Sequence, residues 1–397
     1  MPEAFSISTA RSRFPALQHD QVFLDNAGGS QALGSVIDSI TQYLSKTNVQ
    51  LGASYHTGTI SNTKYAQGYE AAAKYVNASR GEIVLGSSTT QLFMNLSYAL
   101  NIPSGSTIIL SKLEHETNVK PWLHLASRLN LTVKWWESNA SDGLKLTPQN
   151  LKPLLSDDVK FVACTHVSNI LGSIHDIKAI AELVHSVGAL FCVDGVSYAP
   201  HRQVDVKEFG VDFYAFSWYK VYGPHISLLY ASTSAQEHIK PLNHYFNPSK
   251  TLEDKLALAG SGYEAVQAIP EIVSYLSPPG EVFSAIAAHE AKLSAILLEF
   301  LNSRDDITVW GSKDSDQGVR VPTISFSVKG KGSKEVVEAA EKISNFGFRY
   351  GHFYSKRLCD EVLGVTDPQY VVRASAVHYN TEQEIRGLVE VLKKVLP

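Results

Sequence analysis

Short apolar runs alternate along most of the chain with longer stretches whose apolar residues recur at the helical period. The runs predict strands at residues 82–88, 106–112, 132–138, 160–168, 189–195, 212–217 and 226–232. The periodic stretches predict helices at residues 62–78, 90–101, 118–130 and 177–188. The runs are apolar throughout rather than at every second position. This pattern favours an α/β fold with a mostly parallel sheet that helices cover on both faces.

The pattern changes between residues 245 and 285, which are rich in loop-forming residues. Beyond them we predict a helix at 281–303 and strand, helix and strand segments at 321–328, 333–347 and 371–379. Thr381, with Glu384 three residues later, forms a capping box that predicts the start of the last helix. A chain of 397 residues exceeds the usual size of one core. We therefore predict an N-terminal segment (1–20) that packs on the small domain, a large domain (21–280) and a small C-terminal α+β domain (281–397).

Composition narrows the class of protein. Apolar residues make up 44% of the chain and charged residues 19%, as in a folded globular protein. The net charge of −4, without a basic run, gives no basis for nucleic-acid binding. The apolar runs are too short to span a membrane, and the N-terminus lacks the layout of a signal peptide, so we expect a cytoplasmic protein without a membrane partner. The cysteines, Cys164, Cys192 and Cys359, are too scattered for a disulfide framework or a zinc site, and we expect no metal.

Ligands of such sheets bind at the carboxyl ends of the strands. Residues 87–90 (SSTT) follow the first predicted strand and begin a helix, where hydroxyls and free N–H groups suit an anion such as phosphate, although Ser88 or Thr89 could simply cap that helix. His115 follows the second strand. It does not start an HExxH zinc motif, because Val119 occupies the second histidine's position. His115 could therefore act as an acid or base, stack on a ligand, or be an inert polar residue.

Two further strand ends carry polar residues. Asn169 and His166 lie near the end of the 160–168 strand, where both could hydrogen-bond a ligand, or Asn169 could serve only a turn. Asp194 ends a strand that is otherwise apolar, so burial will make its charge costly without a partner. A charged heterocyclic nitrogen, Arg202 or a lysine would each satisfy Asp194.

Lys220 stands at the end of another apolar strand, beside Trp218, Tyr219 and Tyr222. Desolvation should lower its pKa and favour the neutral amine, which is the nucleophilic form that makes Schiff bases. The alternatives are a structural ion pair with Asp194 and a side chain that extends to solvent. Together with the anion site and the buried acid, however, Lys220 completes what pyridoxal 5′-phosphate (PLP) requires. Its phosphate needs a helix terminus, its ring nitrogen an acid and its aldehyde a lysine.

At this point the chain resembles the class V aminotransferase family of fold-type I PLP enzymes, and within it the cysteine-desulfurase-like branch. The likeness covers nearly the whole chain, in the segments FLDNAGGSQ, LGSSTTQ, LEHETN, THVSNILGSIHDI, VDGVSYAPH, DFYAFSWYKVYGPH and VVRASAVHYNTEQEI. It implies a large domain with a mostly parallel sheet of the seven-stranded type, a smaller α+β domain and PLP as cofactor.

The resemblance also implies roles for single residues. The expected catalytic residues are Lys220, which forms the Schiff base, Asp194, which pairs with the ring nitrogen, and His115, which stacks over the ring. The expected cofactor contacts also include the phosphate-binding set Thr89, Thr90, Ser217 and Tyr219, together with Asn169 and Ser197, the latter in place of a glutamine near the phenolic oxygen. Ser261 matches a threonine that reaches the partner's phosphate, which implies a homodimer with composite sites.

On the substrate side the resemblance implies an α-amino acid whose α-carboxylate binds Arg373, as suits the bidentate fork of arginine. Asn169 is a further substrate-side candidate. Five more residues could contact the substrate or serve only in packing: Tyr55, His56, Tyr245, His352 and Tyr354.

One departure from the family pattern bears on the reaction. Desulfurases of this branch carry a catalytic cysteine where the segment RYGHFY has Tyr354. Cys359 lies in an apparently helical segment, and Cys164 and Cys192 lie in apolar strands, so no cysteine is placed to form a persulfide. We therefore expect a lyase-type reaction, either C–S cleavage by β-elimination or decarboxylative C–C bond formation, the latter because fungal relatives with similar SWYK and NHYF segments perform it. An aminotransferase is the alternative, and a cysteine-desulfurase label would reflect similarity.

Two other classes fit less well. A dinucleotide-binding oxidoreductase would need the glycine fingerprint, but the nearest match, GSGYEA at residues 260–265, does not follow a predicted strand. A catalytically inactive PLP fold used for binding is disfavoured because Lys220, Asp194, His115 and Arg373 are all present.

Overall fold

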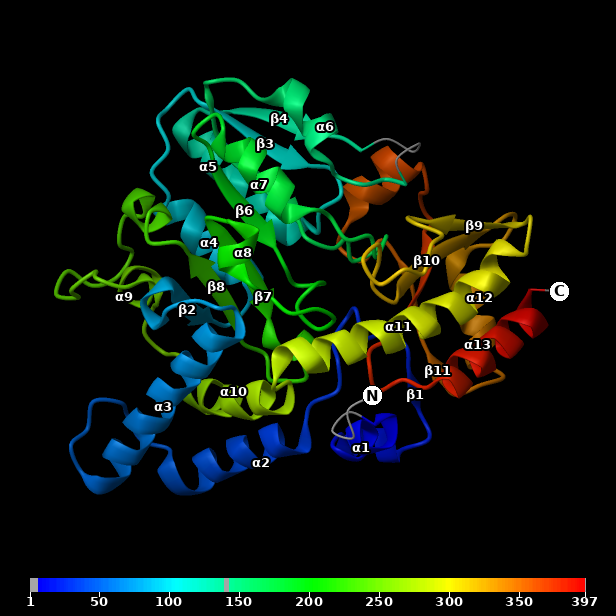
Figure 1. Ribbon diagram of the computed structural model, residues 1–397, viewed down its shortest axis with the longest axis horizontal. Coiled ribbons are helices and arrows are strands. Elements are labelled where there is room, and N and C mark those ends of the chain that lie inside the picture. The colour runs from blue at the N-terminus through cyan, green and yellow to red at the C-terminus, as the bar shows by residue number, and fades with distance from the viewer. Residues whose placement is uncertain (1–5, 139–142, 397) are drawn as a thin grey trace.

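The computed structural model describes residues 6–138 and 143–396, and its larger sheet has seven strands (Figure 1). In spatial order they are β2 (Ile83–Gly86), β8 (Ser227–Ala231), β7 (Phe213–Ser217), β6 (Leu190–Asp194), β5 (Val159–Thr165), β3 (Thr107–Ser111) and β4 (Thr132–Trp136). Each predicted strand is confirmed. Only β8 runs antiparallel to its neighbours, because a tight turn, closed by Trp218 N–H donating to the Ile226 carbonyl at 2.8 Å, follows β7 directly. The α/β fold class is confirmed.

Helices cover both faces of this sheet. The predicted helices correspond to α3 (His56–Tyr75), α4 (Thr89–Ala99), α5 (Lys120–Leu129) and α7 (Ile177–His185). Phe161 and Val162, consecutive residues of β5, point to opposite faces, and both are fully buried. Phe161 packs in a core with residues of α4 and α5, and Val162 in a core with residues of α3 and α7. Burial on both faces is why these strands are apolar throughout.

A second, antiparallel sheet has the order β12 (Arg349–Gly351), β13 (Val371–Ser375), β10 (Thr323–Val328) and β9 (Ile307–Trp310). Three helices pack with it: α11 (Pro279–Asn302), α12 (Ser333–Glu341) and α13 (Glu382–Val395). The capping box at the start of α13 is confirmed, with both of its hydrogen bonds formed. In Figure 1 the long α11 crosses from the larger sheet to the smaller one. Of the small sheet, β9 and β12 were not predicted.

Residues 245–285, which were predicted to be rich in loops, contain a 13-residue helix, α10 (Tyr263–Tyr275). Pro270 lies inside it, which normally opposes a helix because proline lacks an N–H. The helix buries Val266, Ile269 and Ile272 against neighbouring elements, α3 and α2 (Gly34–Gln42) among them, so packing outweighs the local preference. The remaining helices and strands are α1 (Ile7–Ser12), β1 (Val22–Phe23), α6 (Pro148–Leu151), α8 (Val206–Phe209), α9 (Leu252–Leu256) and β11 (Phe346–Gly347).

The N-terminal segment lies against the C-terminal part of the chain. Arg11 Nη1 donates to the Tyr379 carbonyl at 2.8 Å and pairs with Glu384 at 2.9 Å, and β1 pairs with β11. The domain boundaries at 20/21 and 280/281 stay predictions. Among the described residues, no helix is long and apolar enough to cross a membrane, and no group of three or more His, Cys, Asp and Glu side chains is arranged to hold a metal ion.

Candidate active site

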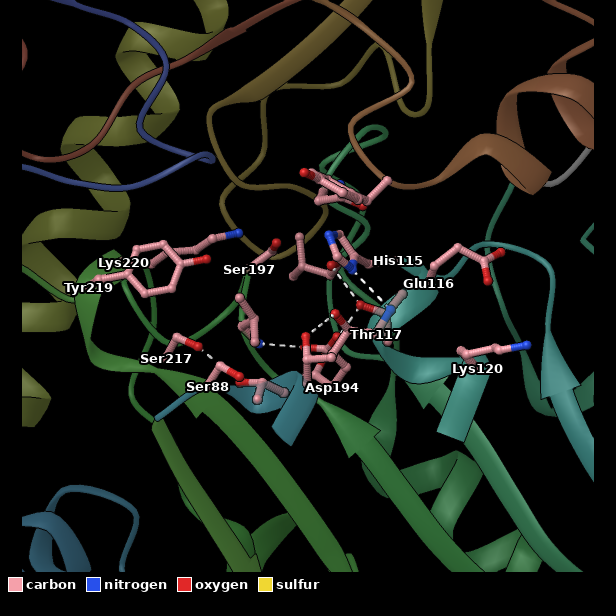
Figure 2. A pocket seen from close by; sticks show the side chains of 17 residues that line it. Ser88, His115, Glu116, Thr117, Lys120, Asp194, Ser197, Ser217, Tyr219 and Lys220 are labelled. Atoms are coloured by element: carbon pink, nitrogen blue, oxygen red, sulfur yellow. Dashed lines mark hydrogen bonds between the residues drawn. The ribbon is translucent and has the colours of Figure 1, made fainter. Parts of the chain in front are cut away.

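A cavity of about 440 Å³ lies at the carboxyl edge of the larger sheet (Figure 2). The predicted site residues that line it are Thr89, Thr90, His115, Asn169, Asp194, Ser197, Ser217, Tyr219, Lys220 and Tyr354. Lys220 and Tyr219 lie on one side of this cavity, and Glu116 and Lys120 on the opposite side (Figure 2). Strand ends far apart in the sequence thus meet at one site, as parallel strands require.

Lys220 ends a short 3₁₀ turn (Trp218–Lys220) directly after β7. The residue is only 7% exposed, and its side chain extends into the cavity (Figure 2). Burial and, after it, the positive charge of Arg373 lower the pKa of the Lys220 amine, and Asp194 opposes them, so that the pKa is about 8. The protonated amine still predominates near pH 7, but the neutral form that a nucleophile needs is far more abundant than in an ordinary lysine.

Asp194 ends β6 and is 5% exposed. Within the described part of the chain, the hydrogen bond to its side chain comes from Val196 N–H, 2.9 Å from Oδ1. Burial raises the pKa of the Asp194 carboxyl, and the Val196 N–H and the charge of Lys220 offset part of the rise, so that the pKa is about 6. Arg202, one partner considered for Asp194, pairs instead with Glu290 at 2.9 Å. A buried carboxyl with so few donors suits a cationic ring nitrogen.

His115 has a defined proton position. Thr117 N–H donates to its Nδ1 at 3.1 Å, so in the neutral ring Nε2 carries the proton. Burial lowers the pKa of His115 to about 3, and the charge of Lys220 adds to this, so the ring is neutral. Its centroid lies 5.3 Å from that of Tyr354. His115 therefore offers a flat, uncharged face and one N–H donor.

Hydroxyl groups gather where α4 begins. Ser88 is the N-cap, and its side chain accepts from Gln91 N–H at 3.1 Å, so the capping interpretation holds for this residue. Thr89 Oγ1 lies 2.9 Å from Ser217 Oγ, which lies 2.6 Å from Ser227 Oγ. This chain of hydroxyls beside a helix N-terminus suits a phosphate group. Ser227 was not predicted as a site residue, although it is a polar residue at the second position of the predicted 226–232 strand.

Further polar contacts extend this cradle. Thr90 Oγ1 lies 2.8 Å from Thr117 Oγ1, and the Tyr219 ring stacks on His225 with centroids 4.8 Å apart. Phosphate cradle, buried acid and amine are thus all present at one cavity. The residues fit pyridoxal phosphate.

Asn169 lines the cavity, but its side chain is already engaged. Its Nδ2 donates to the Phe353 carbonyl at 3.0 Å, and its Oδ1 accepts from Ser355 Oγ at 2.9 Å. Between these contacts, Phe353 and Tyr354 both have left-handed backbones, with φ of 49° and 59°. Glu116 N–H also donates to the Tyr354 carbonyl at 2.9 Å. Asn169 therefore anchors the turn that presents Tyr354, and a direct ligand contact of Asn169 stays a prediction.

Other predicted residues lie outside the cavity. Arg373, in β13, is buried, with Nη2 2.8 Å from the Asp25 carboxylate and Nη1 donating to the Asn169 carbonyl at 3.1 Å. Its Nε has no partner among the described residues. His166, for which a ligand contact was one possibility, does not line the cavity: it is buried, stacks on Tyr198 with ring centroids 3.5 Å apart, and has Nδ1 3.0 Å from the Tyr214 hydroxyl.

The rest of the predicted set is peripheral in a single chain. Tyr55 and His56 are exposed at the start of α3, and Ser261 lies in the turn before α10. His352 lies edge-on to the Tyr370 ring at 5.2 Å, and Tyr245 is 99% exposed. These residues do not line the cavity.

The positions of the cysteines show whether one of them could form a persulfide at the cavity. Cys164, Cys192 and Cys359 are all buried, and burial raises the pKa of each thiol, that of Cys359 to about 12. Tyr354, by contrast, lines the cavity and is 72% exposed. These buried cysteines are therefore not placed to supply a reactive thiolate at the cavity.

Comparisons with known proteins agree with this geometry. The sequence profile described as Aminotransferase class-V matches residues 22–388. The chain is 53% identical to the Aminotransferase-like protein FGM3 of Gibberella zeae, over 99% of both chains. It is 36% identical to the Cysteine desulfurase-like protein ustD of Aspergillus flavus, over 100% of this chain and 92% of that protein. The fold is similar to that of the cysteine desulfurase CsdA from Escherichia coli, with a TM-score of 0.87 and 24% identity over 99% of this chain and 98% of that chain.

The predicted resemblance, the fold-type I architecture, the enzymatic nature and pyridoxal phosphate as cofactor are thereby confirmed. The chain belongs to the class V aminotransferase family of PLP-dependent enzymes.

Proposed function

We propose that this enzyme acts on an α-amino acid in a lyase-type reaction that needs no persulfide-forming cysteine. The reaction is either C–S cleavage by β-elimination or decarboxylative C–C bond formation. The observation that carries the proposal is Tyr354, which lines the cavity against His115 where a desulfurase needs a thiol, while the chain's own cysteines are buried.

The cofactor, when bound, supplies an electron sink for the bond broken at the substrate. Ionised Asp194 keeps a proton on the ring nitrogen, and this charge makes the sink effective. Lys220, whose amine pKa of about 8 lies near physiological pH, takes and returns the proton at the substrate Cα. His115, whose neutral ring lines the cavity, would cover one face of the cofactor ring and keep water from it. Catalysis is thus assigned to Lys220, Asp194 and His115.

Binding roles follow the same geometry. The phosphate is assigned to Thr89, Thr90, Ser217 and Tyr219, and the region of the ring's phenolic oxygen to Ser197 and Asn169. Arg373 is assigned to the substrate α-carboxylate. Because its guanidinium pairs with Asp25, substrate binding requires Arg373 to share or exchange that partner. Tyr354 then contacts the substrate side chain.

A homodimer with composite sites is part of the proposal. Ser261 is assigned to the phosphate of the partner subunit, and Tyr55, His56 and His352 to the substrate side. In support, Tyr55, Tyr245 and Phe246 are large hydrophobic residues that a single chain leaves exposed. Burial of such residues at a subunit interface would stabilise the dimer.

Transamination is the second candidate. A neutral Lys220 beside Asp194 also suits proton transfer between two carbon atoms, and FGM3 is described as aminotransferase-like. The same assay distinguishes the two, because transamination yields a keto acid without sulfide or carbon dioxide.

Two measurements test the proposal. The purified protein should be yellow, and borohydride should bleach it and fix the cofactor to Lys220. Incubation with a panel of amino acids should then yield carbon dioxide, sulfide or an elimination product, measured separately from keto acid and from deuterium uptake at Cα. A colourless protein that does not bind added PLP would refute the cofactor roles. Sulfide from free cysteine together with a persulfide on Cys359 would refute the assignment of Tyr354.

A further inference from the structure

A chain of buried hydrogen bonds connects the Lys220 turn to the C-terminal part of the molecule. Its central residue is Tyr222, two positions after Lys220 and fully buried. The Tyr222 hydroxyl donates to the Pro200 carbonyl at 2.9 Å and lies 2.9 Å from His378 Nδ1. His378 Nε2 in turn lies 2.6 Å from the Tyr275 hydroxyl of α10. His378 itself follows β13, five residues beyond Arg373.

The direction of each hydrogen bond in this series can be deduced. A carbonyl only accepts, so the single proton of the Tyr222 hydroxyl goes to Pro200. His378 must therefore donate from Nδ1–H to the Tyr222 oxygen. Complete burial lowers the pKa of His378 to about 3, so the ring is neutral and Nε2 accepts from the Tyr275 hydroxyl. One tautomer of His378 satisfies all of these contacts.

The backbone of Tyr222 explains why this residue needs such anchoring. Its φ of 62° is left-handed, a conformation that disfavours residues with a Cβ and persists when the surroundings hold it. Tyr222 N–H donates to Ser30 Oγ at 2.9 Å, and the Tyr222 carbonyl accepts from Leu33 N–H at 3.0 Å. These bonds hold the turn from the N-terminal side. The His378 contact holds it from the opposite end of the sequence.

We propose that His378 is a positioning residue for Lys220: by donating to Tyr222 it fixes the 218–223 turn and keeps the amine in its buried place. The inference rests on the role proposed for Lys220. It also means that the segment carrying Arg373 sets the geometry of the lysine turn. A loosened turn admits water to the Lys220 nitrogen, and water favours the protonated form of that nitrogen, both as a free amine and when it is bonded to the cofactor.

The test is a pH titration of the absorbance of the full-length holoenzyme, which follows protonation at the bond between Lys220 and the cofactor. The amide of His378→Asn can place an N–H near the site of Nδ1, whereas the amide of His378→Gln reaches the site of Nε2, and His378→Phe has no donor. We expect His378→Gln and His378→Phe to raise the midpoint by about half a unit or more, since a buried hydrogen bond is lost. His378→Asn should stay close to wild type. Tyr222→Phe, which removes one oxygen atom, should shift the midpoint in the same direction as His378→Phe.

The matched control is His289→Phe. His289 is also a buried histidine, with Nε2 2.8 Å from the Asn380 carbonyl, and among the described residues no hydrogen bond joins it to the lysine turn. This variant should lower the melting temperature and leave the midpoint unchanged. If the His378 and Tyr222 variants lose only thermal stability and titrate like wild type, the inference is wrong. Tyr222→Phe preserves the test if the other substitutions prevent folding. Borohydride labelling of wild-type Lys220 is checked first, so that failure of the proposed function is recognised separately.

Discussion

The two sides of the cavity are built differently. On the cofactor side, Asp194 and Ser217 end strands of one sheet, Thr89 and Lys220 lie three residues beyond strand ends of the same sheet, and all four are buried. At the mouth, Glu116, Lys120 and Tyr354 come from loops or helix starts, and Tyr354 and Lys120 are exposed. The cofactor side is thus fixed by the same packing that stabilises the sheet. The mouth depends on contacts between segments that are distant in the sequence.

This difference indicates where chemistry and selectivity reside. A buried amine and acid with displaced pKa values serve any reaction of the cofactor. An exposed turn held by a few hydrogen bonds can change its side chains at small cost to the fold. Tyr354, on which the proposed reaction rests, lies in a turn of this second kind.

Removing Lys220 is the largest perturbation of the cofactor side. Lys220→Ala should reduce turnover by roughly 10²–10⁴-fold, because it deletes the general acid–base group. Borohydride should no longer attach the cofactor, although PLP can still bind non-covalently through the hydroxyl cradle. Steady-state kinetics and mass spectrometry of the reduced protein measure both effects, with the exposed Lys240→Ala as the control. Retained turnover would remove Lys220 from the mechanism.

Asp194→Asn should have the next largest effect, roughly ten- to a hundredfold on turnover, because a charge-assisted hydrogen bond to the ring nitrogen is lost. The apoprotein offers a second readout. Burial raises the folded-state pKa of Asp194 to about 6, above its value near 4 when unfolded, so its stabilising contribution is present below pH 4 and is lost as the pH rises through about 6. In denaturant titrations between pH 4 and 7, the free energy of unfolding of the wild-type apoprotein should therefore fall relative to that of Asp194→Asn as the pH rises through about 6. A constant difference across that range would contradict the buried, protonated state.

The cofactor side could be predicted from sequence because its residues follow apolar strands. Complete burial on both faces marks β5, β6 and β7, and the carboxyl ends of such strands converge. Asp194 and Lys220 were therefore recognisable as polar residues in costly positions. The helix α10 was not, because Pro270 and the surrounding turn formers favour a loop and only tertiary packing decides otherwise.

The mouth could not be predicted in the same way. The Asn169 amide is paired with Phe353 and Ser355, more than 180 residues away, and Arg373 with Asp25, almost 350 residues away. No local pattern announces such partners. For the same reason the hydrogen bond between Tyr222 and His378 leaves no signal in either segment alone.

Tyr354 tests the mouth directly. Tyr354→Ala should raise KM for the amino acid roughly two- to tenfold, since an aromatic contact contributes about 0.5–1.5 kcal/mol, and should leave the labelling of Lys220 intact. Tyr350→Ala, a partly exposed tyrosine that does not line the cavity, is the control. Tyr354→Cys should introduce a thiol that reacts with iodoacetamide while the native wild-type protein stays unlabelled, because its own cysteines are buried. Rapid labelling of the wild type would show that a buried cysteine reaches the surface.

The smallest expected effect concerns the anchor of the mouth. Ser355→Ala removes the hydroxyl that donates to Asn169 Oδ1, and should lower the free energy of unfolding by about 1 kcal/mol. The loss stays modest because Asn169 lines the cavity, where water can replace the hydroxyl. Ser344→Ala, which deletes a helical side-chain bond to the Ala340 carbonyl, serves as the matched control and should stay within about 0.5 kcal/mol. If Asn169 anchors the turn, Ser355→Ala will also raise KM in the direction of Tyr354→Ala while the absorbance titration at Lys220 stays unchanged. A shift of that titration instead would mean that the two sides of the cavity are coupled.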